Sequence, residues 1–354
     1  MKDYSYQNRA AKEALVGLLG GQYVATVLAA CPGSGKTTIS HMIINSYLKL
    51  FPKANILVLT EGQNLLKNQY IEDLSSPNTP IEFSFGALDS EAQVRVGIPQ
   101  SIQLLNLSSI DLLVVDEAHN FYLANNVQSI IKKLQPKHQL LLTGTPTKYT
   151  LHNDTSLGRK YGMVYISAED LENNNVFSKV DMDILKLSSK NSPFEAVEKM
   201  FEKASKNKDN ISKIMIACPN ISFAKKVADN LKYRGRKVSL STSDNDKDSS
   251  EVKRFKSGET DVLVVVGRGI LGFNDSKITM LADFRSSSNL DAGYQIFARV
   301  LRTHPQGLRK AYYRISDNAS FNKQVIFMHK IAALMKRDVF KKYNGTNLTV
   351  NIGG

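Results

Sequence analysis

Residues 30–37 combine glycines, a lysine and a hydroxyl in the order that a phosphate-binding loop needs. The stretch reads Ala30-Cys31-Pro32-Gly33-Ser34-Gly35-Lys36-Thr37, and it joins an apolar run to a segment with helical periodicity. Glycines let backbone N–H groups approach phosphates, and the start of a helix favours negative charge. Lys36 would reach the β- and γ-phosphates, and the Thr37 hydroxyl would hold Mg²⁺. We expect ATP to be bound by Pro32, Gly33, Ser34, Gly35, Lys36, Thr37 and Thr38.

Two adjacent carboxylates follow a second apolar run. Asp116 and Glu117 come directly after residues 110–115, in the sequence Asp-Glu-Ala-His that ends at His119. Ligands of open α/β folds bind at the carboxyl edge of the sheet, so we expect both carboxylates there. Asp116 would assist Mg²⁺ coordination, and Glu117 would orient and polarise the attacking water. The alternative is a solvent-exposed acidic loop. The two motifs together indicate an NTPase, and they leave kinases, transporters and switches open.

Short apolar runs alternate with helical patterns along the chain, which is typical of parallel α/β architecture. We expect strands at 23–30, 55–59, 94–97, 110–115, 139–142, 213–217, 237–241, 261–266, 278–282 and 311–315. We expect helices at 36–50, 194–207, 221–233, 290–302 and 319–343. Residues 151–190 are rich in Asn, Ser, Lys and Asp, so we place a boundary near 180. The predicted domains are therefore 1–180 and 181–354.

Composition narrows the class of protein. The 354 residues, 42% of them hydrophobic, suit two globular domains. The sequence has no apolar run of about 18 residues and no secretory signal pattern, and two cysteines are too few for a disulfide framework. We therefore expect a cytoplasmic protein without a membrane partner. The formal charge is +13, and after residue 300 ten Lys and Arg face two acids. This excess of positive charge favours a polyanionic partner. The alternative is that the basic side chains form a solvated surface that only keeps the protein soluble.

Further segments, in order along the chain, resemble the motifs of superfamily 2 helicases and translocases. They are Gln7, residues 56–60, 94–101, 116–119, 142–146, 214–219, 271–274 and 295–302. The resemblance implies two tandem RecA-like P-loop domains, each with a mostly parallel sheet flanked by helices, and a C-terminal helix. It implies an adenine contact for Gln7, and coupling roles for His119, Gly272 and Asn274. It also implies nucleic-acid contacts for Thr60, Gln100, Ser101, Thr143 and Thr145.

The segment from Gln295 to Arg302 resembles the sixth motif of that family, Gln-x-x-Gly-Arg-x-x-Arg, with Ala298 in place of the glycine. On a helix, Gln295, Arg299 and Arg302 share one face. The resemblance implies that these three catalytic side chains point toward the γ-phosphate bound by the first domain. Such an arginine finger can raise the rate by roughly 10³–10⁵. The alternative is a basic helix that forms surface ion pairs.

The resemblance implies an ATP-dependent helicase or translocase with ATP and Mg²⁺ as cofactors. The Thr-Gly-Thr-Pro form of residues 143–146 and the Gln-x-x-x-Arg pattern favour DNA, single-stranded or branched, read with weak sequence preference. An RNA helicase and an ATPase switch that remodels complexes without unwinding remain alternatives. A core with so little added to it is typical of a phage or mobile-element helicase acting in the host cytoplasm, or of a motor that takes its specificity from a protein partner.

Overall fold

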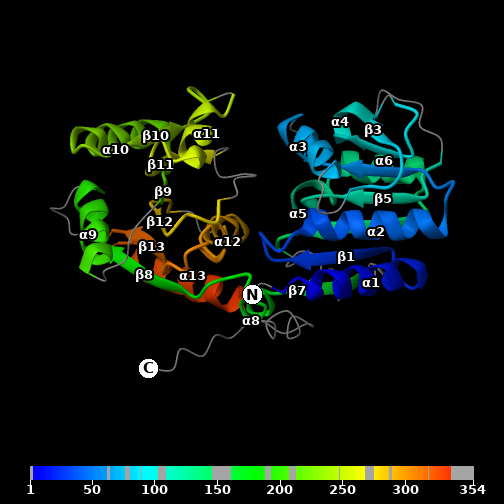
Figure 1. Cartoon of the computed structure of the whole chain (residues 1–354), viewed down its shortest axis with the longest axis horizontal. Coiled ribbons are helices and arrows are strands. Elements are labelled where there is room, and N and C mark those ends of the chain that lie inside the picture. Colours follow the sequence, from blue (N-terminus) through cyan, green and yellow to red (C-terminus); the bar gives the residue numbers. More distant parts are fainter. Residues whose placement is uncertain are drawn as a thin grey trace. The chain divides into compact units, whose positions relative to one another are not determined.

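The computed structural model describes residues 3–61, 64–75, 80–88, 90–102, 109–145, 161–187, 193–206, 213–246, 248–267, 275–286, 289–317 and 319–335. The described chain divides into two compact units, Met1–Leu171 and Glu172–Met335. Each unit has its own parallel sheet (Figure 1). The boundary expected near residue 180 stays a prediction.

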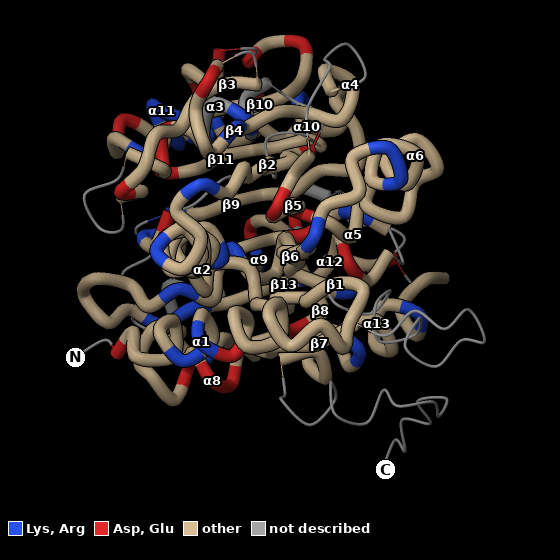
Figure 2. Tube along the Cα trace, turned by 90° about the vertical axis from the view of Figure 1, so that its right-hand side faces the viewer, with Lys and Arg blue, Asp and Glu red and all other residues tan. Residues whose placement is uncertain are grey.

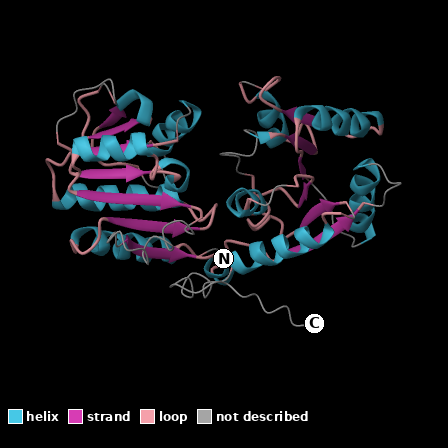
Figure 3. Cartoon of the chain, turned by 180° about the vertical axis from the view of Figure 1, so that it is seen from behind, coloured by secondary structure: helices cyan, strands magenta, loops and turns pink. Residues whose placement is uncertain are grey.

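The first unit contains seven parallel strands in the order β3-β4-β2-β5-β6-β1-β7. The strands are β1 (Ala25–Ala30), β2 (Ile56–Leu59), β3 (Phe85–Ala87), β4 (Val94–Gly97), β5 (Leu112–Val115), β6 (His138–Thr143) and β7 (Tyr161–Ile166). The helices are α1 (Ser5–Leu19), α2 (Lys36–Leu50), α3 (Asn64–Leu74), α4 (Pro99–Ile102), α5 (Ala118–Phe121), α6 (Asn125–Leu134) and α8 (Ala168–Asn173). Helices lie on both faces of the sheet (Figure 3).

Three interior strands of this sheet are buried along their whole length, which explains their nearly continuous apolar sequences. All residues of β1, β2 and β5 are buried. On one face, Val27, Leu57 and Leu141 pack with Tyr122 and Ile130 from the α5–α6 region. Because every strand is parallel, the carboxyl ends of β1, β5 and β6 lie at the same edge of the sheet, where the phosphate-binding loop begins.

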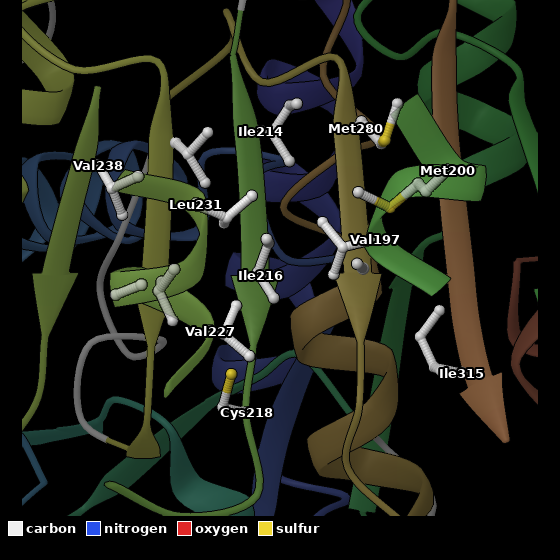
Figure 4. Close-up of a cluster of buried hydrophobic side chains, with 14 of the residues drawn as sticks. Val197, Met200, Ile214, Ile216, Cys218, Val227, Leu231, Val238, Met280 and Ile315 are labelled. Atoms are coloured by element: carbon white, nitrogen blue, oxygen red, sulfur yellow. The ribbon is translucent and has the colours of Figure 1, made fainter. Parts of the chain in front are cut away.

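The second unit contains six parallel strands in the order β10-β11-β9-β12-β13-β8. The strands are β8 (Val180–Lys186), β9 (Ile214–Ala217), β10 (Val238–Ser241), β11 (Val262–Val265), β12 (Met280–Asp283) and β13 (Lys310–Ser316). The helices are α9 (Pro193–Lys206), α10 (Ile221–Tyr233), α11 (Ser250–Ser257), α12 (Leu290–Phe297) and α13 (Phe321–Leu334). One face of the sheet packs against α9 and α10, where Val197, Met200, Val227 and Leu231 meet Ile214 and Ile216 (Figure 4).

Two parallel α/β domains are what the sequence predicted, and three strands were missed. β7 and β8 lie within the polar stretch that was read as a junction, and β3 has only three residues. All three are edge strands of their sheets. In β8, exposed residues alternate with residues that are mostly half-buried. β3 and β8 bury less surface than the central strands, so their sequences carry a weaker apolar signal, whereas β7 is mostly buried and lies in a stretch of polar composition.

Candidate ATP site and coupling residues

The loop after β1 turns back sharply before α2 begins at Lys36. Gly33 and Gly35 have positive φ angles of 96° and 85°, a region that glycine enters without steric cost. The loop is tied to its surroundings by two backbone hydrogen bonds, from Ser34 N to Cys31 O at 3.0 Å and from Cys31 N to Ile166 O at 2.9 Å. The loop therefore has the strand–turn–helix geometry that exposes backbone N–H groups at a helix start, and such a site suits phosphate.

The first turn of α1 packs directly on this loop. The Tyr6 hydroxyl donates to Ser34 O at 2.7 Å, and Gln7 Nε2 donates to the same oxygen at 3.1 Å. A Cβ atom built on Gly35 would lie 2.5 Å from Gln7 Nε2, so a larger residue would displace the Gln7 amide, and the φ of 85° would strain it further. The predicted adenine contact of Gln7 is not tested by these bonds. They show that its amide nitrogen already faces the loop.

Asp116 and Glu117 lie at the carboxyl end of β5, as expected. Lys36 Nζ is 3.6 Å from Glu117 Oε1, so the lysine of the loop and the carboxylate meet across the intervening strand β6. Burial and the neighbouring Glu117 carboxylate raise the pKa of Asp116 to about 7, against the opposing effect of Lys36. A carboxylate that is costly to ionise in this way gains most from a cation beside it. This environment suits a divalent metal ion beside Asp116, and the Mg²⁺ roles of Asp116 and Thr37 stay predictions.

A chain of polar contacts leads from Glu117 to the end of β6. His119 Nδ1 lies 3.5 Å from Glu117 Oε2 and 3.1 Å from the Thr143 hydroxyl. That hydroxyl donates to Thr145 O at 3.1 Å and accepts from Thr145 N at 3.0 Å. The direction of the bond between His119 Nδ1 and the Thr143 hydroxyl depends on the tautomer of His119. His119 thus connects the carboxylate to the loop after β6, which suits the predicted coupling role.

The predicted nucleic-acid residues separate into two groups. Thr60, Thr143 and Thr145 are buried, with exposures of 1%, 0% and 1%. Their hydroxyls do not reach the surface, so a phosphate contact at these positions would need backbone N–H groups or a shift of the loops. Gln100 is exposed and Ser101 is half-buried on the short helix α4. All five assignments stay predictions, and Gly272 and Asn274 lie outside the described residues.

The helix expected over 290–302 is shorter than predicted. α12 ends at Phe297, so Arg299 and Arg302 do not continue the helical face of Gln295. Arg302 instead forms an isolated antiparallel bridge with Phe177. The neighbouring backbone is used for the same pairing, with Ser178 N donating to Leu301 O at 2.8 Å and Thr303 N to Val176 O at 3.1 Å. These strand-like bonds compete with helix continuation. The catalytic roles of Gln295, Arg299 and Arg302 stay predictions.

A buried ionic cluster in the second unit was not anticipated. Asp283, at the end of β12, accepts from Arg314 Nη1 at 2.8 Å, from Arg285 Nε at 2.8 Å and from the Tyr312 hydroxyl at 3.1 Å. The Asp283 and Arg314 side chains have 0% exposure. The Arg314 guanidinium also stacks over the Phe327 ring at 4.1 Å and donates to Gln324, so it ties β12 to α13. These residues come from three short segments, 283–285, 312–314 and 324–327, and no local pattern marks their pairing.

Basic side chains occur at several exposed ends of the described elements. Lys132 and Lys133 lie in the last turn of α6, the blue segment beside its label in Figure 2. Within α13, Lys323 and Lys330 are exposed, and the basic residues after Met335 lie outside the described part. In the described residues, no three or more His, Cys, Asp and Glu side chains gather where they could together hold a metal ion, and no helix is long and apolar enough to span a membrane.

Comparison with known proteins agrees with this geometry. Residues 1–148 match the sequence model of a family described as type III restriction enzyme, res subunit. No curated protein sequence matches the chain. Among solved structures, S. cerevisiae Dbp5 bound to RNA and ADP BeF3 is similar, with a TM-score of 0.67, 15% identity and coverage of 96% of this chain and 93% of that one. Mycobacterium smegmatis helicase Lhr bound to ssDNA and AMP-PNP has a TM-score of 0.64 and 13% identity, over 91% of this chain and 47% of that one.

Proposed function

We propose that the chain is an ATP-dependent nucleic-acid motor of the superfamily 2 helicase type. The match of residues 1–148 to the family model and the fold of two parallel-sheet RecA-like domains support this proposal. The observation that carries the proposal is the pairing of Lys36 with Glu117, at 3.6 Å, beside the buried Asp116 carboxyl. A phosphate-loop lysine, a metal-binding acid and a water-orienting acid at one sheet edge are the parts that NTP hydrolysis needs.

The residues of the first unit have distinct roles in this proposal. The backbone of residues 32–38 and Lys36 bind the triphosphate, and Thr37 with Asp116 hold Mg²⁺, which offsets the charge on the phosphate oxygens. Glu117 accepts a proton from the attacking water and orients it. Since Lys36 contacts Glu117 in this structure, nucleotide binding exchanges an ion pair within the protein for an ion pair with phosphate. The lysine is then drawn from Glu117, and the carboxylate becomes available to water.

Coupling to nucleic acid would pass through His119. His119 Nδ1 lies 3.5 Å from Glu117 Oε2 and 3.1 Å from the Thr143 hydroxyl. A movement of the Glu117 carboxylate would therefore shift His119 and, through it, the loop after β6. We assign Gln100 and Ser101 on α4, with the backbone at Thr60 and Thr145, to the nucleic-acid track. Arg299 and Arg302, with Gln295, complete the proposed catalytic set as an arginine finger, and Arg302→Ala is expected to bind nucleotide and lose most hydrolysis.

DNA is the proposed track, single-stranded or branched, on the strength of the Thr-Gly-Thr-Pro sequence and the basic character of the chain. The structural neighbours bind RNA in one case and ssDNA in the other. An RNA helicase is therefore the second candidate, and a nucleic-acid-stimulated switch that displaces no strand is the third. A protein partner that supplies specificity, and a cytoplasmic site of action in a host infected by a phage or mobile element, belong to the same proposal.

Steady-state ATPase activity tests the proposal. The purified full chain is assayed alone and with single-stranded, branched and duplex DNA and with RNA, and Lys36→Ala serves as the inactive control. Stimulation by single-stranded or branched DNA is the expected result, and strand displacement on that substrate then separates a helicase from a switch. Stimulation by RNA alone would favour the second candidate. Hydrolysis that no nucleic acid stimulates would overturn the motor and leave an ATPase of another kind.

A further inference from the structure

The Ser34 carbonyl is the point at which α1 holds the phosphate-binding loop. The Tyr6 hydroxyl and Gln7 Nε2 both donate to this oxygen, at 2.7 and 3.1 Å, and Gln7 Nε2 lies 3.3 Å from the Tyr6 oxygen. Tyr6 and Gln7 are buried, with 2% and 9% exposure. A buried carbonyl with two fixed donors has one favourable orientation, because any other orientation leaves polar groups unsatisfied.

The orientation of that carbonyl fixes the direction of the next backbone N–H. A trans peptide is a rigid plane in which the C=O of one residue and the N–H of the following residue point in opposite directions. Turning the Ser34 C=O toward α1 therefore turns the Gly35 N–H away from α1 and into the loop. N–H groups that converge inside such a loop are the donors that bind phosphate oxygens.

Steric restrictions alone do not select this orientation. Gly35 has a φ of 85°, and glycine enters both signs of φ at similar cost. A rotation of the peptide between Ser34 and Gly35 is therefore cheap on the Gly35 side, and it would turn the N–H out of the loop. The two hydrogen bonds from α1 therefore determine the orientation of the peptide between Ser34 and Gly35, which the glycine itself does not restrict.

We propose that the Tyr6 hydroxyl is a positioning group for the triphosphate: by holding the Ser34 carbonyl it presets the Gly35 N–H toward the nucleotide phosphates. The inference rests on the proposed ATP site and adds a residue to it. Tyr6 acts on the loop rather than on the nucleobase, because its hydroxyl proton is used on Ser34 O. Its effect therefore belongs to the phosphate part of the ligand and does not depend on which base is attached.

The test uses Tyr6→Phe, which removes the hydroxyl and keeps the buried ring. Affinity is measured by displacement of a fluorescent ATP analogue with two competitors, MgATP and inorganic tripolyphosphate with Mg²⁺. The second competitor carries phosphates and no base. We expect Tyr6→Phe to weaken both competitors by the same factor, roughly three- to tenfold, the usual effect of one lost hydrogen bond.

Tyr47→Phe is the matched control. Tyr47 is also 2% exposed and lies in the first unit, but its hydroxyl bonds to His138 Nδ1 at 2.8 Å rather than to the loop. This variant loses a buried tyrosine hydroxyl bond of similar quality, and we expect its affinity for both competitors to stay within about twofold of the parent protein. A general loss of packing would weaken the two variants alike.

Three outcomes would count against the proposal in different ways. If Tyr6→Phe binds both competitors like the parent protein, or no worse than Tyr47→Phe does, the hydroxyl does not position the loop. If Tyr6→Phe weakens MgATP and leaves tripolyphosphate unchanged, Tyr6 acts through the base, and the peptide-orientation argument is wrong. If the parent protein binds neither competitor, the ATP site itself fails, which is a result distinct from the other two.

Discussion

Replacing Arg314 with methionine should destabilise the second unit by about 3–4 kcal/mol. The Arg314 and Asp283 side chains are 0% exposed and 2.8 Å apart, so the substitution removes one of the two arginines that pair with this buried carboxylate. Removing one partner of a buried ion pair typically costs about 3–5 kcal/mol. Arg285 and Tyr312 still donate to Asp283, which keeps the cost toward the lower end of that range. The variant also loses the bond to Gln324.

Urea unfolding followed by peptide-level hydrogen exchange gives the measurement for each unit separately. Peptides from β12 and β13 report the second unit, and peptides from β1 and β5 should keep their protection. The control is Arg254→Met on α11. Arg254 pairs with Glu251 at 3.0 Å and with Glu259 at 3.3 Å, but its side chain is 47% exposed. Exposed ion pairs contribute about 0–1 kcal/mol to the free energy of unfolding, so this variant should be nearly as stable as the parent protein.

The double variant Asp283→Asn/Arg314→Met separates charge from packing. If the cost of Arg314→Met comes from a stranded carboxylate, neutralising Asp283 in the same chain should recover part of the lost stability. A cost below about 1 kcal/mol for Arg314→Met alone would refute the reasoning, since Asp283 would then tolerate burial without its arginine. A large cost that the double variant does not reduce would assign the effect to lost packing on Phe327.

Four further predictions concern the first unit. Lys36→Ala should lower ATP turnover at least about 100-fold, measured by steady-state phosphate release, because the lysine charge on the phosphates is lost. Glu117→Gln should bind ATP and trap it unhydrolysed, as followed by single-turnover assays and retained nucleotide. Gly35→Ala should destabilise the fold by about 1–2 kcal/mol in urea unfolding and weaken nucleotide binding, because of its φ of 85° and the contact with Gln7. Burial and the charge of Lys137 lower the pKa of His138, so the contribution of His138 to stability should be full above pH 6.5 and decline as pH falls below it. In thermal unfolding, His138→Gln should remove this part of the pH dependence.

Each of these has a result that contradicts it. Turnover in Lys36→Ala within tenfold of the parent protein would remove the lysine from the catalytic set. Rapid hydrolysis by Glu117→Gln would give the water-orienting role to another group. Unchanged nucleotide affinity in Gly35→Ala would mean that the loop adjusts without loss. Melting temperatures that respond alike to pH between 7 and 5 in His138→Gln and in the parent protein would show that His138 titrates alike in the folded and unfolded chain.

The sequence predicted the parallel α/β organisation well because its central strands are buried on both faces. Residues 56–59, 112–115 and 262–265 are uninterrupted apolar runs, and all of them are interior strands. The edge strand β8 alternates polar and apolar residues, and it lies in a stretch dominated by polar composition. Such a strand is recognisable only from its partner β13, and pairing is a long-range property that a local pattern does not contain.

The candidate site could be predicted where its residues are adjacent in sequence. The loop at 30–37 and the pair Asp116–Glu117 each sit in one short segment, and the meeting of their side chains follows from parallel strands ending at one edge. The contact of Tyr6 with Ser34 joins segments from different elements, and no local sequence pattern indicates it. The early end of α12 depends on backbone pairing with residues 176–178, which no helical periodicity reveals.

The backbone at Glu117 has a consequence for anyone who engineers this protein. Its φ of 47° lies in the left-handed region, where a residue with a side chain carries a cost of about 1–2 kcal/mol that glycine escapes. A library selected only for heat resistance should therefore enrich glycine at position 117. Glycine at this position removes the proposed water-orienting carboxylate together with the backbone strain. Such a selection would therefore yield more thermostable variants that no longer hydrolyse ATP. Position 117 should be held fixed in any stabilisation campaign.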